Sequence, residues 1–327
     1  MKVSILGAGS WGTALAIHLA RTGHEVCLWG RDPEVSASIE ATRRHPRRFS
    51  DLEIPPTVRA TSSLADAIAH SQTLVLSVPC ASLRSVLEAA ALPPGPRRFL
   101  STAKGIEPDT GKRMSEILRD YAAGSMVAAL SGPTFAEGIA RGDPSAAVIA
   151  DSGEGLAREL QQSFSSSHFR LYSSDDLVGV ELSGALKNVV AVAAGIVSGL
   201  GYGHNTLAAL VTRGLAEIGR IVRGKGGQPR TVAGLAGIGD LLLTCTGKQS
   251  RNRRVGEEIG RGRKLAEILI EMPEVAEGPR TCLAVPKMAA EVGVEAPIAE
   301  AVVKVLYEGA DPREAVENLM TRTLRPE

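Results

Sequence analysis

The sequence feature that most constrains the fold is a glycine-rich stretch at residues 2–12, which follows a short β-prone run and opens a helical pattern. Gly7, Gly9 and Gly12 stand at G-x-G-x-x-G spacing. In such a turn the first glycine permits a tight bend, the second lets the backbone approach a pyrophosphate, and the third lets helix and strand pack closely. The helix N-terminus then offers unpaired N–H groups and a partial positive charge to phosphates. The stretch predicts a dinucleotide-binding site at the start of the chain.

The end of the second predicted strand, residues 25–29, bears on which dinucleotide binds. In this fold an acidic residue at that point accepts a hydrogen bond from the 2′-hydroxyl of the adenosine ribose. The corresponding residue here is Arg31, whose guanidinium suits a 2′-phosphate or stacks on adenine; the alternative is a solvated loop residue. Asp32, which precedes Pro33, is explained as the N-cap of the next helix. We therefore expect NADP or NAD as cofactor, and Arg31 favours NADP.

Four arginines then surround His45 and Pro46 in a basic loop. One interpretation of this loop is a solvated connection between elements, and the other places Arg48 beside the cofactor. The arginines are Arg43, Arg44, Arg47 and Arg48.

Alternating strand and helix patterns over the first half of the chain predict a doubly wound parallel sheet, with ligands at the carboxyl ends of its strands. Lys104, Thr134 and Ala136 follow such ends and are expected over the nicotinamide half of the site. Further along, strand patterns fade and helical ones dominate. The predicted architecture is an α/β Rossmann-type NAD(P)-binding domain at residues 1–175 and an all-α substrate domain at residues 176–327. The further strand candidates are residues 73–78, 99–102, 126–130, 146–150 and 169–172.

Composition narrows the class of protein. The chain has 327 residues, 44% of them hydrophobic, which is enough for two domains with substantial cores. A net charge of +1 gives no reason to expect nucleic-acid binding. The four cysteines are far apart and lack zinc-site spacing, so we expect reduced thiols, a cytoplasmic location and no metal. We also expect no signal peptide and no membrane span, because a strand pattern begins at once and the most apolar run, residues 189–200, is shorter than roughly 20 residues.

Lys187 is the leading candidate for chemistry. It stands in a long helical pattern, residues 175–197, and its neighbours three and four positions away are small or apolar, without an acid to pair it. An ammonium desolvated in this way is driven toward its neutral form, and a lysine near neutrality can accept a proton from a substrate alcohol. The alternative is a surface lysine on the exposed face of the helix, and spacing alone does not decide between the two.

A second dense stretch runs over residues 234–254. Three glycines precede Asp240, which we expect to be a loop carboxylate placed by closely packed backbone. Ser250, Arg251 and Asn252 supply hydroxyl, guanidinium and amide donors just before a helix, which is typical of a phosphate clamp. The alternative for these three is a polar N-cap with solvated arginines. His204 lies in a glycine-rich loop and is interpreted as structural rather than catalytic.

Taken together, these motifs resemble the bacterial NAD(P)-dependent sn-glycerol-3-phosphate dehydrogenase family. The matching segments follow the family's order over nearly the whole chain. They are GAGSWGTALA (residues 7–16), AKGIE (103–107), LSGPTFAE (130–137), ELSGALKNVVAVAAG (181–195), NTLAALVTRGLAE (205–217), GLAGIGDLLLTCT (234–246), SRNRRVG (250–256) and EG (277–278).

The resemblance implies reversible hydride transfer between the nicotinamide and C2 of glycerol 3-phosphate, giving dihydroxyacetone phosphate, with glycerol 3-phosphate supplied to phospholipid synthesis. It assigns proton transfer to Lys187 and places Lys104 near the substrate oxygen, where a second cation helps keep Lys187 neutral. The substrate residues it implies are Lys104, Gly132, Thr134, Lys187, Asp240, Ser250, Arg251 and Asn252. The cofactor residues it implies are Ser10, Trp11, Arg31, Lys104, Ala136, Arg251, Val275 and Glu277, and Asn188 and Thr244 are additions to the site. Gly7, Gly9 and Gly12 of the turn and Arg48 complete the expected cofactor site.

Two segments depart from the family pattern. Residues 45–50 read HPRRFS where the family usually has N-P-x-Y-L-P, so Arg48 stands in place of a tyrosine and its cofactor contact is open. Residues 247–249 differ from the usual serine-rich version. The alternative functions are a related 3-hydroxyacid or 6-phosphogluconate-type dehydrogenase, and a cofactor-sensing protein without turnover, which would not require Lys187 or Lys104. A homodimer is compatible with a helical domain rich in small residues.

Overall fold

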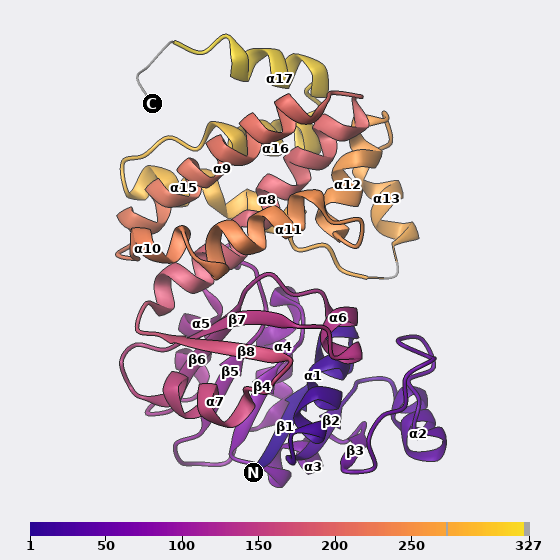
Figure 1. The fold of residues 1–327 in the computed structure, drawn as a ribbon. Helices are drawn as coiled ribbons and strands as arrows, with labels where there is room; N and C mark the ends of the chain where they lie inside the picture. The colour runs from indigo at the N-terminus through magenta and orange to yellow at the C-terminus, as the bar shows by residue number, and fades with distance from the viewer. Residues whose placement is uncertain (273, 324–327) are drawn as a thin grey trace. The chain divides into compact units, whose positions relative to one another are not determined.

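The computed structural model describes residues 1–272 and 274–323, which form two compact units (Figure 1). Each unit is assembled from two stretches of chain. The first unit contains Met1–Ala103 and Arg113–Val180, and the second contains Lys104–Lys112 and the chain from Glu181 onwards.

The structural division comes after Val180, and Lys104–Lys112 groups with the second unit although it follows directly on a strand of the sheet. The spacing of apolar residues does not predict that Lys104–Lys112 belongs to the second unit, because this grouping depends on contacts with residues far along the chain. The expected boundary after residue 175 stays a prediction, and residues 324–327 of the expected second domain lie outside the described residues.

The first unit is built on an eight-stranded sheet in the order β3-β2-β1-β4-β5-β6-β7-β8 (Figure 1). The first six strands in this order pair in parallel, which is the Rossmann arrangement, so the predicted fold class is confirmed. Ligands bind beyond the carboxyl ends of such strands, where the order reverses beside β1. The strands are β1 (Lys2–Leu6), β2 (Glu25–Trp29), β3 (Val58–Thr61), β4 (Thr73–Leu76), β5 (Arg98–Ser101), β6 (Met126–Ser131), β7 (Ser145–Ala150) and β8 (Phe169–Ser174).

The expectation of an entirely parallel sheet is wrong at β7, which pairs antiparallel to β6. The connection from β6 contains one short helix, α6 (Ala136–Arg141), of 6 residues. The chain re-enters the sheet from the end at which β6 finishes, and β8 then pairs parallel to β7. The short strand β3 is a further difference, since it was not among the predicted strands.

Helices cover both faces of the sheet, and alternate strand residues point into two separate cores. In β1, for example, Val3 and Ile5 belong to one core and Leu6 to the other. Burial on both faces explains why the strands read as nearly continuous apolar runs. The first core is covered by α1 (Ser10–Arg21), α2 (Pro33–Thr42) and α7 (Leu156–Phe164), and the second by α3 (Leu64–His70), α4 (Leu83–Ala90) and α5 (Met114–Tyr121).

The central helix of the second unit is α8 (Leu177–Gly199), whose first residues, up to Val180, belong to the first unit. The expectation of no membrane span relied on the apolar run at residues 189–200, but α8 as a whole has the length and composition of a span, with a mean hydropathy of 1.5. However, 94% of that apolar window is buried inside the protein, which is typical of the core helix of a folded domain. The sequence argument predicted this helix but not its span-like length and composition, because it counted an uninterrupted apolar run, which stops at Lys187 and Asn188.

Two helices of the second unit approach each other so closely that their glycines have no room for a side chain. A Cβ atom on Gly195 of α8, or on Gly256 of α12 (Arg251–Gly260), would lie 2.0 Å from a backbone oxygen of the other helix. This contact holds the C-terminal half of α8 against α12. The helices that carry Lys187 and Asn252 are therefore fixed relative to each other by backbone packing.

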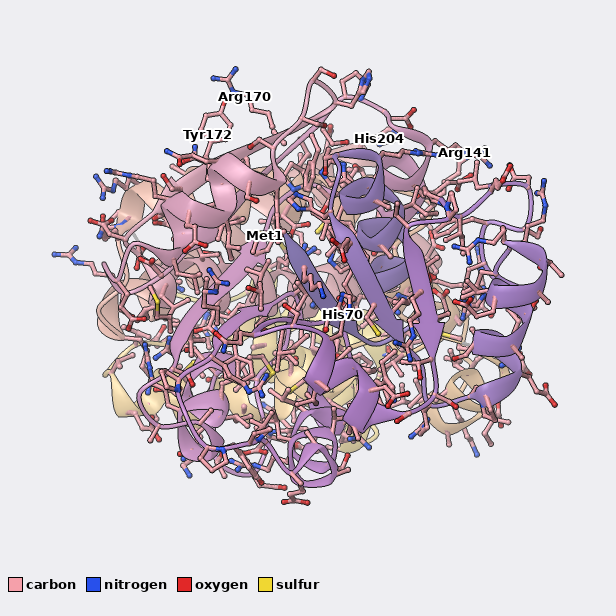
Figure 2. The ribbon with its side chains drawn as sticks, turned by 90° about the horizontal axis from the view of Figure 1, so that it is seen from below. Met1, His70, Arg141, Arg170, Tyr172 and His204 are labelled. Atoms are coloured by element: carbon pink, nitrogen blue, oxygen red, sulfur yellow. The ribbon has the colours of Figure 1, made fainter. Side chains whose placement is uncertain are left out.

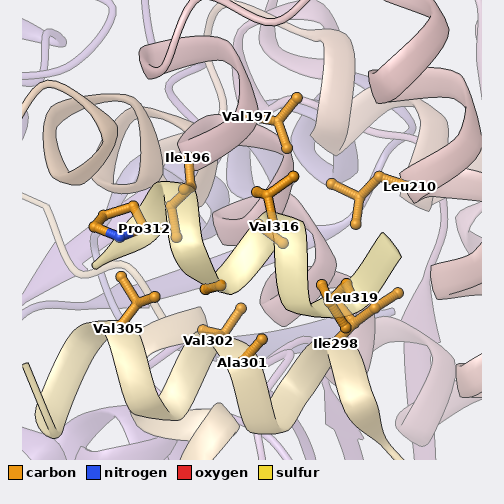
Figure 3. Close-up of a pocket in the computed structure, with 12 residues that line it drawn as sticks. Ile196, Val197, Leu210, Ile298, Ala301, Val302, Val305, Pro312, Val316 and Leu319 are labelled. Carbon is orange, nitrogen blue, oxygen red and sulfur yellow. The ribbon is translucent and has the colours of Figure 1, made fainter. Parts of the chain in front are cut away.

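The remaining helices of the second unit pack around α8 and α12. An apolar pocket lies beneath the last helix, α17, where Val316 and Leu319 face side chains of α8, α9 and α16 (Figure 3). Every residue that lines this pocket is apolar, so it is not a site for proton or phosphate chemistry. The helices are α9 (His204–Gly224), α10 (Pro229–Val232), α11 (Asp240–Thr246), α13 (Leu265–Glu271), α14 (Gly278–Thr281), α15 (Val285–Glu291), α16 (Pro297–Tyr307) and α17 (Pro312–Met320).

Candidate active site

Lys187 lies in the middle of α8 and is only 5% exposed, so the alternative of a surface lysine is wrong. Its Nζ donates to Asp240 Oδ1 at 2.5 Å and to Thr244 Oγ1 at 2.6 Å. The sequence pattern correctly found no acid on the lysine's own helical face. The acid comes from α11, which is 53 residues further along the chain and which no local period could link to Lys187.

Asp240 bridges two lysines. Its Oδ2 accepts from Lys104 Nζ at 2.6 Å while its Oδ1 accepts from Lys187, and the carboxylate is 1% exposed. The expectation of a loop carboxylate is wrong, because a π-helical turn at Leu235–Gly239 runs directly into α11 and makes Asp240 its first residue. Gly237 permits this turn, since a Cβ there would lie 1.9 Å from a backbone oxygen.

The electrostatics of this cluster follow from burial and from its two-to-one ratio of cations to anion. Burial lowers the pKa of Lys187 to about 8; Lys104 acts in the same direction and Asp240 opposes it. Burial alone would raise the pKa of Asp240, but the two ammonium groups outweigh it and hold this pKa below its ordinary value. The structure therefore places an ionised carboxylate beside a lysine whose pKa is lowered toward physiological pH.

Thr244 fixes the direction of the lysine. Its hydroxyl donates to the carbonyl oxygen of Asp240 at 2.6 Å, one helical turn earlier, and so its oxygen is left to accept from Lys187. The Thr244 hydroxyl is thus a second acceptor for the Lys187 ammonium, beside Asp240, and it carries no charge.

A relay of amides joins α8, α12 and α14 to Lys104. The Gly278 N–H donates to Asn252 Oδ1 at 2.8 Å, Asn252 Nδ2 donates to Asn188 Oδ1 at 2.9 Å, and Asn188 Nδ2 donates to the Lys104 carbonyl at 2.8 Å. The backbone groups at the two ends determine which way each amide faces. Asn188 thus ties Lys104 to α8 through its backbone, while Asp240 holds its side chain. Sequence spacing did not reveal this relay.

The rest of the expected phosphate clamp occupies the start of α12. The Ser250 hydroxyl is the N-cap of this helix and accepts from the Arg253 N–H at 3.2 Å, as the N-cap interpretation proposed. Arg251 is the first helical residue; its side chain is 49% exposed and its Nε lies 3.7 Å from a carboxylate oxygen of Glu274. Val275 is 46% exposed. Their contacts with substrate or cofactor, and those of Glu277 at the N-cap position of α14, stay predictions.

In the first unit, the glycine-rich turn lies between β1 and α1. Gly7 adopts φ +124°, and a Cβ on Gly12 would lie 1.9 Å from the Gly7 carbonyl oxygen, so both positions require glycine. A Cβ on Gly9 would meet nothing within 4 Å, which leaves this backbone open to a ligand. Gly9 is also the N-cap of α1 and has no side chain with which to cap this helix. These features fit a bound pyrophosphate.

The end of β2 leads into α2 through an exposed Arg31. Asp32 is the N-cap of α2, as expected, and its carboxylate accepts from the Glu34 N–H at 3.0 Å. The same carboxylate pairs with Arg47 at 2.6 Å. This ion pair is exposed, so the interpretation of the basic loop as a solvated connection also stays a prediction. Arg48 is partly buried, and its contact with cofactor stays a prediction.

The remaining expected residues of the first unit follow β6. Gly132 adopts φ +151°, and a Cβ there would lie 2.8 Å from the Cα of Ala147, so this position also requires glycine. The Thr134 hydroxyl donates to the Gly132 carbonyl at 3.2 Å, and Ala136 is the first residue of α6. Their roles at substrate and cofactor stay predictions.

Two further expectations concern His204 and the absence of a metal site. His204 is the exposed first residue of α9 (Figure 2). Within residues 1–272 and 274–323, no cluster of three or more His, Cys, Asp or Glu side chains could hold a metal ion.

Comparison with known proteins covers both units. Two family models match, described as the N-terminus and the C-terminus of NAD-dependent glycerol-3-phosphate dehydrogenase, over residues 2–157 and 176–317. A relative from Geobacter sp. (strain M21), named as an NAD(P)+ glycerol-3-phosphate dehydrogenase, is 47% identical over 331 residues, covering 100% of this chain and 98% of the relative. A similarly named relative from Chlorobium limicola is 45% identical, covering 100% and 99%.

A solved structure is also similar along its whole length. The crystal structure of glycerol-3-phosphate dehydrogenase from Coxiella burnetii matches with a TM-score of 0.93 at 35% sequence identity, covering 98% of this chain and 99% of that one. A ketopantoate reductase from Ralstonia eutropha matches with a TM-score of 0.63 at 20% identity, which shows a shared fold only.

Proposed function

The chain belongs to the NAD-dependent glycerol-3-phosphate dehydrogenase family, and from this premise we propose that Lys187 moves the proton in reversible oxidation of glycerol 3-phosphate to dihydroxyacetone phosphate. The enzyme is an NAD(P)-dependent oxidoreductase. The observation that carries the role of Lys187 is its burial between Asp240 and Thr244 with a pKa lowered to about 8. When bound, the nicotinamide cofactor supplies or accepts the hydride.

In the direction of ketone reduction, the ammonium form of Lys187 donates a proton to the oxygen at C2. In the direction of alcohol oxidation, the neutral amine accepts that proton. A pKa near 8 leaves both forms populated close to neutral pH, so one side chain serves both directions. Thr244 and Asp240 limit the movement of the Nζ group, because both accept hydrogen bonds from it.

Lys104 and Asp240 have supporting roles in this proposal. Lys104 places a second positive charge near Lys187, which disfavours the ammonium form and offers a donor to substrate oxygen. Asp240 keeps the two lysines together and prevents their mutual repulsion from separating them. We propose that its contribution to substrate binding is exerted mainly through these lysines, since it is 1% exposed.

The phosphate group is held, in this proposal, by donors at the start of α12. Ser250 and Asn252 are buried and already oriented by hydrogen bonds, while Arg251 projects an exposed guanidinium. A guanidinium binds a phosphate through two parallel hydrogen bonds, and a phosphate held away from C2 positions the reacting carbon. In the first unit we propose substrate contacts at Gly132 and Thr134.

For the cofactor, we propose the turn at Gly7, Gly9 and Gly12 for the pyrophosphate, with Arg31 favouring NADP over NAD. The open backbone at Gly9, which is the N-cap of α1, supports the first assignment. The exposed guanidinium of Arg31 supports the second. The other proposed cofactor contacts are Ser10, Trp11, Arg48 and Ala136 in the first unit and Lys104, Arg251, Val275 and Glu277 in the second.

We further propose a cytoplasmic homodimer that supplies glycerol 3-phosphate for phospholipid synthesis. All four cysteines are buried and outside any disulfide, which supports a reducing compartment. Light scattering of the purified chain at several concentrations tests the assembly, and a mass of one chain throughout would contradict the homodimer.

The decisive experiment measures oxidation of NADPH and NADH by the purified chain with dihydroxyacetone phosphate and, separately, with unphosphorylated dihydroxyacetone. We expect turnover that depends on the phosphate. Turnover with a 3-hydroxyacid or 6-phosphogluconate in its place would support the alternative dehydrogenases, and cofactor binding without turnover would support a sensor.

A further inference from the structure

His45, in the basic loop between α2 and β3, has no role in the function described so far. It is only 3% exposed, and both ring nitrogens are engaged. Nε2 lies 3.0 Å from the carbonyl oxygen of Ala8, which is the residue between the first two glycines of the turn. Nδ1 lies 3.1 Å from the backbone nitrogen of Arg47.

These two contacts determine the tautomer of the ring. A backbone N–H only donates and a backbone carbonyl only accepts, so Nδ1 accepts from Arg47 and Nε2 carries the proton that is donated to Ala8. Burial lowers the pKa of His45, the hydrogen bond to Ala8 opposes this, and Arg48 and Arg47 lower it further. The ring is therefore neutral and makes a directed hydrogen bond to the glycine-rich turn.

Holding the Ala8 carbonyl also orients the next backbone donor. The Ala8–Gly9 peptide is planar and trans, so its carbonyl oxygen and its N–H point in opposite directions. Fixing the oxygen of Ala8 therefore fixes the direction of the Gly9 N–H. On the other side, Ala8 is confined by Gly30, where an added Cβ would lie 2.9 Å from the Ala8 Cβ.

The loop that carries His45 is itself anchored at several points. The Arg43 guanidinium donates to the carbonyls of Pro55 and Val58, both at 2.6 Å. Arg47 pairs with Asp32 at 2.6 Å. Further along, Asp51 pairs at 2.8 Å with Arg141 of α6, which Figure 2 labels. His45 is thus held by the protein independently of the turn that it contacts.

We propose that His45 is a positioning residue, which through the Ala8 carbonyl aims the Gly9 N–H at the pyrophosphate of the dinucleotide. This inference rests on the proposed binding of NAD(P) at the glycine-rich turn. It predicts a contribution to affinity that NADPH and NADH share, because both contain the pyrophosphate, and that does not touch the proton transfer at Lys187.

The test compares three replacements that separate the hydrogen bond from the shape of the ring. His45→Phe keeps a ring of similar size without a donor. His45→Asn keeps an amide that is too short to reach Ala8, whereas His45→Gln places an amide nitrogen at about the position of Nε2. The matched control is His24→Phe, since His24 is also buried and its Nε2 lies 2.9 Å from the Ser163 carbonyl, away from the turn.

Dissociation constants are measured for NADPH, NADH and adenosine 2′-phosphate, which lacks the pyrophosphate. For His45→Phe and His45→Asn we expect the constants for both dinucleotides to rise about tenfold, with kcat at saturating cofactor within about twofold of wild type. His45→Gln should restore affinity to within about threefold, and the affinity for adenosine 2′-phosphate should not change in any variant. His24→Phe should change thermal stability without this selective loss.

The outcomes distinguish the inference from the proposed function. If the wild-type chain binds neither dinucleotide, both fail. If the wild type binds and His45→Asn binds as tightly as His45→Gln, only the role of His45 is overturned. Equal loss of adenosine 2′-phosphate and dinucleotide would also overturn it, because that result indicates general disruption of the loop. If His45→Phe does not fold, the comparison of His45→Asn with His45→Gln decides.

Discussion

The glycine-rich turn and the lysine–aspartate cluster of Lys104, Lys187 and Asp240 differ in the chemical groups that form them. The turn uses backbone: Gly7 and Gly12 give it its shape, and it leads into a helix, α1, whose N-cap is Gly9. The cluster uses side chains, with Lys104, Lys187 and Asp240 brought together from distant parts of the chain. Loss of a side chain beside a backbone site, such as His45, should weaken ligand binding in part, whereas a cluster of three charges depends on each member. Replacements in the two regions should therefore differ in size and kind.

The largest effect is expected for Lys187→Ala. Removing the proton-transfer group should lower kcat roughly 1,000-fold in both directions, while cofactor dissociation constants stay within about twofold. Steady-state kinetics and cofactor titration measure the two quantities. Lys225→Ala is the matched control, because Lys225 also pairs with a carboxylate, that of Glu291, elsewhere in the second unit. Wild-type turnover by Lys187→Ala would remove the lysine from the mechanism.

A smaller effect is expected for Arg251→Ala. Loss of a guanidinium that binds phosphate should raise KM for dihydroxyacetone phosphate roughly 50-fold, corresponding to about 2.3 kcal/mol, and should leave activity on unphosphorylated dihydroxyacetone nearly unchanged. Arg254→Ala, a replacement of an exposed arginine in the same helix, is the control. An unchanged KM would exclude Arg251 from the clamp.

Gly12→Ala tests the backbone region directly. The new Cβ would lie 1.9 Å from the Gly7 carbonyl oxygen, so the turn must distort. We expect the free energy of unfolding to fall by about 2 kcal/mol and the cofactor dissociation constant to rise roughly 30-fold. Gly9→Ala is the comparison, because open space at Gly9 should leave the stability of the ligand-free protein unchanged. Equal destabilisation by both replacements would contradict the separate roles of the two glycines.

The wild-type pH profile should follow the protonation of Lys187. With a pKa of about 8, the neutral fraction rises as pH increases through 8, so kcat for glycerol 3-phosphate oxidation should rise roughly eightfold to tenfold between pH 7 and pH 9. Reduction needs the ammonium and should slow over the same interval. Rates measured in both directions at saturating substrates test this, and profiles that move together would contradict a single shared proton donor and acceptor.

The smallest effect is expected for Arg31→Ala. Exposed charges contribute about 1 kcal/mol, so NADPH affinity should fall roughly fivefold and NADH affinity less than twofold. Titration at low and high salt should show the NADPH effect shrinking as ionic strength increases. Equal losses for both dinucleotides would mean that Arg31 does not distinguish a 2′-phosphate.

Sequence patterns predicted the structure correctly where it depends on residues that are close together in the chain. The turn at Gly7, the N-cap at Asp32 and the long helix around Lys187 were all expected and are present. The antiparallel β7 was not expected, because the end of the sheet at which the chain re-enters is decided by tertiary packing and not by a local pattern. The helical setting of Asp240 was missed because its glycine-rich approach reads as a loop but packs as a π-helical turn.

By itself, the sequence determined the dinucleotide turn, the change from alternating strands and helices to helices alone, and the absence of an acid beside Lys187 on its own helical face. These features depend on residues a few positions apart, so they can be inferred from the spacing of residues along the chain. Only the tertiary structure decided that Asp240 joins Lys187 to Lys104, and that His45 contacts Ala8. Those contacts bring together residues separated by 37 to 136 positions, and they form only when the helices and strands that carry them pack.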